Sequence, residues 1–122
     1  MDNAFDRGIE LFNSGSYFEA HEAFEELWRE SDGDLRSLCQ GLVQACAGLV
    51  KHQRNQPDPA CTLLAKGLLR LEAAPPSCRP DINIGRLIRD LNSVVRALQM
   101  RVSFEPPLIE RLPGGDRPRA AQ

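Results

Sequence analysis

The stretch "DLRSLCQGLVQACAGLVKHQRN" (residues 34–55) decides the fold that the sequence predicts. Placed on a helix at about 100° per residue, its apolar side chains cover most of the circumference. Only Gln40, Gln44 and Lys51 form a narrow polar strip. A helix that is apolar on nearly all sides belongs in the middle of a helical bundle. We therefore expect a central helix over about residues 34–54.

Apolar residues recur at helical spacing on both sides of this stretch, in segments 2–15, 16–30, 58–74 and 82–101. Ser16, with Glu19 three residues later, predicts a capping box at the start of the second segment. In the central helix, Gly41 and Gly48 lower helix propensity, so we expect a neighbouring backbone to approach there. No segment has a convincing strand pattern. The sequence therefore predicts an all-α fold, a compact antiparallel bundle of about five helices with short connections.

Proline and glycine are concentrated near the C-terminus. We predict a helical bundle domain over residues 1–104 and a Pro/Gly-rich, partly disordered C-terminal tail over residues 105–122, with disorder from about Pro113 onward. The segment "PPLIERL" offers apolar side chains for docking on the body or on a partner. These side chains are Leu108, Ile109 and Leu112.

Composition and charge exclude several classes of partner. The net charge is −2 for 122 residues and the pI is about 5.7, so no basic face for nucleic acid is predicted. No apolar run approaches the roughly 20 residues that cross a bilayer. The N-terminal "MDNAFDRG" lacks the apolar core of a signal peptide. We therefore expect a cytoplasmic protein that binds neither nucleic acid nor membrane.

The cysteines fit the same compartment. Cys39, Cys46, Cys61 and Cys78 form no CxxC pair, which argues against a zinc knuckle. Reduced thiols are typical of the cytoplasm. Cys39 and Cys46 fall on the apolar side of the central helix, so we expect both to be small core residues and no disulfide to form.

A histidine and a glutamate stand out in "GSYFEAHEAFEELWRES" (residues 15–31). On the helix that this stretch predicts, His21 shares the apolar face with Tyr17 and Trp28, and Glu25 lies at its edge. His21 and Glu25 are an i,i+4 pair, so their side chains should meet within hydrogen-bond reach. A carboxylate on an inner face costs free energy unless it is paired or binds a metal.

Three interpretations of this pair are open. It could be a structural hydrogen bond that orients the second helix in the bundle. It could belong to a metal site, because imidazole nitrogen and carboxylate oxygen suit zinc, manganese or iron. It could also be a general acid/base pair in a pocket. The residues alone do not decide between them.

Further polar residues are candidates for the same pocket. Gln40 and Gln44 are one turn apart on the central helix and either bond to another helix or line a ligand pocket. His52 sits near the end of that helix, where a cation interacts favourably with the helix dipole. A metal site built from His21, Glu25 and His52 requires the end of the central helix to lie beside the middle of the second helix.

The stretches "FNSGSYFEAHEAFEELW" and "CQGLVQACAGLVKHQRN" together closely resemble the domain of unknown function 309 family of small bacterial and archaeal proteins. The family hallmark, a His, three residues, a Glu, two residues and an aromatic, corresponds to His21, Glu25 and Trp28. The resemblance covers about residues 5–72. It implies a small all-helical bundle, a suggested metal site at the His/Glu motif, and no established function. Further elements of the family's sequence pattern correspond to Tyr17, Gln40, Gln44, His52 and Asn55.

Two classes of function remain open. The first is an enzyme that uses a metal or an acid/base pair on a small molecule, with a hydrolase as the favoured type. The second is a non-enzymatic module that binds a protein partner, because residues 4–28 resemble one tetratricopeptide helix pair. Repeat arrays usually have at least about three units, and only one is recognisable. The candidate ligand-binding residues are Tyr17, Trp28, Gln40, Gln44 and Asn55, and the candidate metal ligands are His21, Glu25 and His52.

Overall fold

A computed structural model describes residues 3–113 of the chain. The helices in this range are α1 (Ala4–Asn13), α2 (Tyr17–Arg29), α3 (Gly33–Gln53), α4 (Pro57–Ala73), the short 3-10 helix η1 (Pro76–Cys78) and α5 (Ile84–Met100). The same residues contain no β-strand, only an isolated bridge between Ile82 and Arg111. None of these helices combines the length and apolarity needed to cross a membrane. The predicted all-α fold is confirmed.

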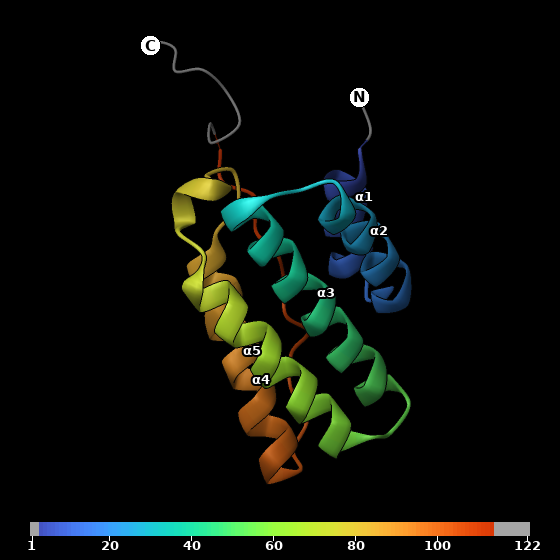
Figure 1. Cartoon of the computed structure of the whole chain (residues 1–122). Coiled ribbons are helices and arrows are strands. Elements are labelled where there is room, and N and C mark those ends of the chain that lie inside the picture. Colours follow the sequence, from blue (N-terminus) through green and yellow to red (C-terminus); the bar gives the residue numbers. More distant parts are fainter. Residues whose placement is uncertain (1–2, 114–122) are drawn as a thin grey trace.

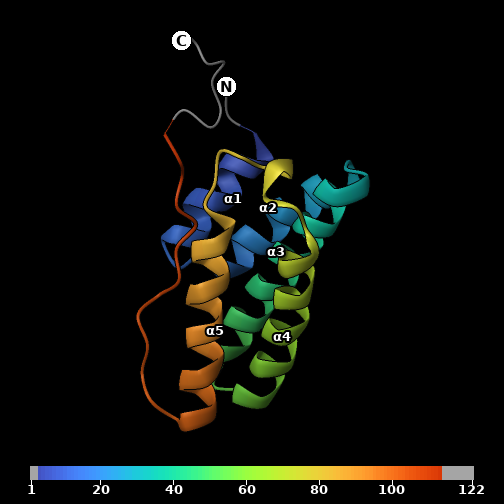
Figure 2. The same cartoon turned by 90° about the vertical axis from the view of Figure 1, so that its left-hand side faces the viewer.

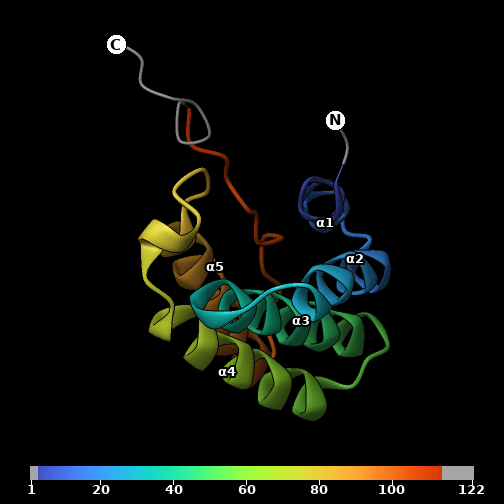
Figure 3. The ribbon, with the colours of Figure 1, turned by 45° about the horizontal axis from the view of Figure 1, so that its top comes forward.

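The helices pack in chain order, with α3 in the middle. α3 contacts α2 on one side and α4 on the other, and α1 and α5 pack on the outer helices of this row. α3, α4 and α5 run side by side along the molecule, while the α1–α2 hairpin covers the remaining side of α3 (Figures 1 and 3). This central position explains why apolar side chains cover most of the circumference of α3. Its buried apolar side chains are Leu38, Cys39, Leu42, Ala45, Cys46, Leu49 and Val50.

Glycines set the close approach of α3 and α4. A Cβ atom on Gly48 would lie 2.8 Å from Leu64 Cγ and 3.0 Å from the carbonyl oxygen of Ala60. At the other end of the contact, a Cβ on Gly41 would lie 3.1 Å from the carbonyl oxygen of Gly67. The predicted approach of a neighbouring backbone is therefore confirmed, and the neighbour is α4.

The helix ends show one departure from the sequence prediction. Asn3 caps α1 by accepting a hydrogen bond from Asp6 N at 2.9 Å, and Asn83 caps α5 through Arg86 N at 3.0 Å. The capping box predicted at Ser16 is wrong, because its side chain makes no capping bond to α2. Ser16 has ψ 68° instead of the extended conformation typical of a cap, and its hydroxyl accepts from Ser14 Oγ at 3.4 Å.

The C-terminal segment (residues 102–113) turns back at the end of α5 and returns along the outside of the bundle between α1 and α5 (Figures 2 and 3). Ile109 is 2% exposed and joins the common core, whereas Leu112 is 36% exposed. Leu108 is half-buried. The sequence left open whether this segment docks on the body of the chain or on a partner. In the structure it docks on the body. The disorder expected beyond Pro113 concerns residues outside the described range.

Candidate functional site

The inner side of α2 forms one wall of the candidate site. Tyr17 and Phe24 are buried, and His21, Glu25 and Trp28 are half-buried. Glu25 and Trp28 lie along the seam with α3. Positions i, i+4 and i+7 share one side of a helix, which is why this motif presents all three side chains together. α2 packs on α3, and Glu25 and Trp28 of this face meet α3 side chains.

A pocket of about 180 Å³ opens where this wall meets α3. Its lining residues are Glu25, Trp28, Gln40, Val43 and Gln44. We call it the α2–α3 pocket. The structure thus brings the two glutamines of α3 to the glutamate and tryptophan of α2. Gln44 also borders a second cavity of about 360 Å³ on the α4 side of α3, so this side chain borders a cavity on each side of the helix.

Three buried polar atoms on α2 and α3 have no hydrogen-bond partner. They are Nδ1 of His21, Nε1 of Trp28 and Oε1 of Gln44. Leaving a buried donor or acceptor unpaired costs about 1–3 kcal/mol, and most buried polar atoms in folded proteins are paired. All three atoms belong to the predicted site residues, and two of those residues line the α2–α3 pocket. The site is therefore a place where the fold tolerates unpaired polar groups.

Two neighbours hold the motif side chains in place. The guanidinium carbon of Arg36 lies 4.0 Å from the centre of the Trp28 ring, and Arg36 Nη1 donates to the carbonyl oxygens of Trp28 and Ser31, each at 3.4 Å. The Phe18 ring stacks on His21 with 6.4 Å between ring centroids and 8° between the planes. Sequence reasoning missed both neighbours. Phe18 precedes His21 by three residues, and this helical spacing could have revealed it.

No helical spacing pointed to Arg36 as a neighbour of Trp28. It lies on α3, across the turn from Trp28, and no periodic spacing joins residues of two different helices. Val43 of the pocket lining was also missed, because an apolar residue on an apolar helix looks like any other core residue.

The predicted hydrogen bond between His21 and Glu25 is not formed. Glu25 Oε1 lies 3.6 Å from Arg29 Nη2, one turn further along α2, and His21 Nδ1 stays unpaired. The Glu25 side chain is 39% exposed, so water and Arg29 satisfy its charge and it needs no imidazole partner. The Glu25 carboxylate is less buried than an inner-face position predicts.

The remaining predicted residues lie elsewhere. His52 packs against Phe104, with 4.8 Å between ring centroids, and lines a cavity of about 450 Å³ that it shares with Tyr17. Burial raises the pKa of the Tyr17 hydroxyl above its ordinary value. His52 and Asn55 border another cavity, of about 250 Å³. None of these three residues lines the α2–α3 pocket.

The described residues do not assemble a metal-ligand set. Within residues 3–113, no group of three or more His, Cys, Asp and Glu side chains is arranged to hold an ion. The required approach of His52 to His21 and Glu25 does not occur, because His52 belongs to the last turn of α3 and faces the C-terminal segment.

The thiols are not poised for chemistry. All four cysteines are free, and Cys39 and Cys46 are buried, as predicted. Burial raises the pKa of Cys39 to about 11 and that of Cys46 further still. A thiolate is the nucleophile and metal ligand, so neither buried cysteine is activated at neutral pH.

Comparison with known proteins fits this geometry. Residues 5–63 match the model of the family described as "Domain of unknown function (DUF309)". This part of the chain is a DUF309 domain. The matched range includes α2, α3 and all of α1 except Ala4, and therefore every residue that lines the α2–α3 pocket. The C-terminal segment lies outside it.

The chain also has relatives among curated proteins. An "Uncharacterized protein" of Aquifex aeolicus (strain VF5) is 26% identical over 85 residues, which cover 69% of this chain and 25% of that protein. The "Uncharacterized protein YpuF" of Bacillus subtilis (strain 168) is 28% identical over 93 residues, which cover 75% of this chain and 53% of that protein. The chain thus spans about a quarter and about half of these two relatives.

Proposed function

We propose that the DUF309 domain of this protein binds a small polar molecule in the α2–α3 pocket. One observation carries the proposal. Trp28 and Gln44 both line the α2–α3 pocket, and each keeps a buried polar atom without a partner. A ligand that pairs with both atoms would remove the cost of leaving them unpaired.

The two atoms define the chemistry of the ligand. The indole Nε1–H of Trp28 only donates, and Oε1 of Gln44 only accepts. A matching ligand therefore carries an acceptor and a donor close together, as primary amides and ureas do. The half-exposed carboxylate of Glu25 at the pocket disfavours an anion. A volume of about 180 Å³ suits a small molecule or a small group of a larger one.

Binding has more support than catalysis. His21 and Glu25 do not form the bonded pair that an acid/base hypothesis assumed. A catalytic zinc normally takes three protein ligands, and residues 3–113 provide no such group. The metal-dependent hydrolase suggested by the sequence therefore rests on the motif alone.

The second hypothesis, a module for a protein partner, has one observation in its favour. The matched segment is 25% of the Aquifex protein, so a related sequence is joined there to a longer chain. This does not assign a partner to the α2–α3 pocket, which has a volume of only about 180 Å³. We further propose a cytoplasmic location, supported by four free cysteines, of which two are buried as thiols.

A fluorescence titration tests the proposal, because Trp28 is the single tryptophan of the chain. Acetamide, which carries a donor and an acceptor, should change the Trp28 emission in a saturable way. Acetone, which lacks the donor that Gln44 Oε1 accepts, should bind more weakly. Gln44→Leu should remove the preference for acetamide, and Gln99→Leu, on the exposed face of α5, should keep it. Equal responses of all three proteins to both compounds would contradict the proposal.

A further inference from the structure

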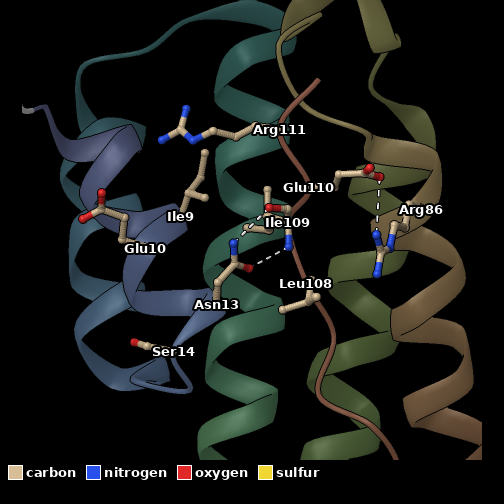
Figure 4. Close-up of a pocket in the computed structure, with 9 residues that line it drawn as sticks. All are labelled: Ile9, Glu10, Asn13, Ser14, Arg86, Leu108, Ile109, Glu110 and Arg111. Atoms are coloured by element: carbon tan, nitrogen blue, oxygen red, sulfur yellow. Dashed lines mark hydrogen bonds and ion pairs between the residues drawn. The ribbon is translucent and has the colours of Figure 1, made fainter. Parts of the chain in front are cut away.

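The C-terminal segment is bound as an extended peptide, mainly through its backbone. The side-chain amide of Asn13 makes two hydrogen bonds to Ile109, with Nδ2 donating to the carbonyl oxygen at 3.0 Å and Oδ1 accepting from the backbone N–H at 2.8 Å (Figure 4). The Asn13 amide therefore makes the two hydrogen bonds, one to the N–H and one to the carbonyl of the same residue, that a neighbouring β-strand would make.

The chain before α5 continues this recognition. Asn83 N donates to the carbonyl oxygen of Glu110 at 2.8 Å, and Leu112 N donates to the carbonyl oxygen of Asp81 at 2.8 Å. Together they form the antiparallel bridge between Ile82 and Arg111. Extended peptides that add to an exposed backbone edge are bound in this way, with backbone bonds for affinity and side-chain contacts for specificity.

The side-chain contacts define a short pattern. Ile109 fills the core position and is 2% exposed. Glu110 lies 3.5 Å from Arg86 Nη1 and accepts from Asn83 Nδ2 at 3.1 Å. Arg111 Nη2 lies 2.9 Å from Asp6 Oδ1. The bound pattern is thus aliphatic, acidic, basic. We call the receiving residues, Asp6, Asn13, Asp81, Asn83 and Arg86, the α1–α5 site.

The chain's own segment fills this site incompletely. A cavity of about 540 Å³ remains beside residues 108–111, with Ile9, Glu10 and Asn13 in its lining (Figure 4). A second cavity, of about 450 Å³, remains beside Phe104 and Pro106. The ion pairs of Glu110 and Arg111 involve side chains 34–44% exposed, where such pairs add little affinity. Among the side chains of the segment, Ile109 is therefore the main anchor.

We propose that the α1–α5 site binds an extended segment of a partner protein with an aliphatic–acidic–basic pattern, and that residues 108–112 of this chain occupy it as an intramolecular competitor. This goes beyond the proposed small-molecule binding and does not depend on it, because no residue lines both sites. A tethered competitor acts at an effective concentration of the order of millimolar, so a partner needs a better fit, and the unfilled cavities leave room for one.

Competition with a synthetic peptide tests this in the full chain. The probe is a fluorescent peptide with the sequence of residues 105–112, "EPPLIERL". Ile109→Ser removes the anchor of the tethered segment without changing the α1–α5 site. We expect the peptide to bind this variant at least about tenfold more tightly than the wild type, as measured by fluorescence anisotropy. Leu112→Ser, at a position 36% exposed, is the matched control and should behave like the wild type.

Two further variants assign the binding to this site. Adding Asn13→Ala to the Ile109→Ser protein should weaken peptide binding about tenfold or more, because both bonds to the Ile109 backbone are lost. A peptide carrying Ile109→Ser should not bind. Peptide binding that survives Asn13→Ala would overturn the proposal. The proposal would also be overturned if the Ile109→Ser protein formed domain-swapped dimers and bound no peptide.

Hydrogen exchange on the wild type keeps the proposal testable even if Ile109→Ser fails to fold. The backbone amides of Ile109 and Leu112 should exchange faster than those of the α3 core, such as Leu42, because the segment opens without unfolding the bundle. Equal protection of Ile109, Leu112 and Leu42 would show that the segment leaves its site only on global unfolding and would overturn the proposal.

Discussion

At the scale of single residues, the bundle holds polar atoms that its own fold does not satisfy. The sequence allowed us to predict that Gln40, Gln44, Glu25 and Trp28 gather at one seam, because helical spacing fixes which side of α2 and α3 each side chain occupies. It could not show that Trp28 Nε1 and Gln44 Oε1 lack partners. That outcome depends on distances between two helices, and no local rule gives these distances.

Gln44→Leu should leave the free energy of unfolding unchanged or raise it by up to about 1–3 kcal/mol, because it replaces an unpaired buried acceptor with an apolar group of similar size. Urea denaturation checks this. Gln99→Leu, at an exposed position, should change the free energy of unfolding by no more than about 0.5 kcal/mol. A loss above about 1 kcal/mol in Gln44→Leu would mean that the amide is bonded within the fold.

The pKa of Cys39 predicts a loss of stability at high pH. Burial raises this pKa from 9.0 to about 11, so the folded state disfavours the thiolate. The contribution is fully present below the unfolded-state pKa of about 9 and is lost as the pH rises toward 11. Cys39→Ala should therefore show a smaller decrease in melting temperature between pH 9 and 11 than the wild type, although its stability at pH 7 is lower. An identical decrease in both proteins would contradict this cause.

At the scale of elements, the contact between α3 and α4 depends on glycine. Gly48→Ala should lower the free energy of unfolding by about 1–3 kcal/mol, because its Cβ would lie 2.8 Å from Leu64 Cγ and 3.0 Å from a backbone oxygen. The gain in helix propensity, about 1 kcal/mol or less, does not offset this.

Gly85→Ala is the matched control on α5. Its Cβ would meet nothing closer than Asn83 Oδ1 at 3.7 Å, so the variant should be as stable as the wild type or slightly more stable. Thermal melting distinguishes the two alanine variants. If both have the same stability, the close approach of α3 and α4 does not constrain residue 48.

The same elements show what a sequence can and cannot reveal. The apolar circumference of residues 34–54 predicted a central helix, and α3 lies between α2 and α4. The capping box at Ser16 failed because the chain turns through Gly15 at φ 85° and brings Ser14 to the Ser16 hydroxyl. Turn geometry of this kind depends on several dihedral angles at once, which a spacing rule does not describe.

At the scale of the whole molecule, one core joins all five α-helices of the described residues with Ile109 of the C-terminal segment. The sequence predicted that Ile109 docks either on the body or on a partner. It did not decide between them, because the surface that Ile109 reaches depends on where α5 ends and on the direction in which the chain returns. The same long-range geometry places His52 beside Phe104 and away from His21. Residues 52 positions apart on a returning chain are beyond the reach of helical spacing.

A shared core predicts cooperative unfolding. Emission of Trp28, which reports the α2–α3 seam, and far-ultraviolet circular dichroism, which reports all helices, should give coincident urea transitions. Two separated transitions would show that the α1–α2 hairpin and the α3–α5 helices unfold independently.

The most direct test of the small-molecule site is the indole Nε1–H signal of Trp28 in a ¹⁵N–¹H correlation spectrum, where a chain with one tryptophan gives one indole peak. A hydrogen bond from Nε1 to a bound amide should shift this peak progressively as acetamide is added, and the shift should saturate. The Gln44→Leu protein should show a weaker, non-saturating shift. An indole peak that stays in place, while acetamide shifts peaks elsewhere in the chain, would contradict the claim that the α2–α3 pocket binds polar ligands.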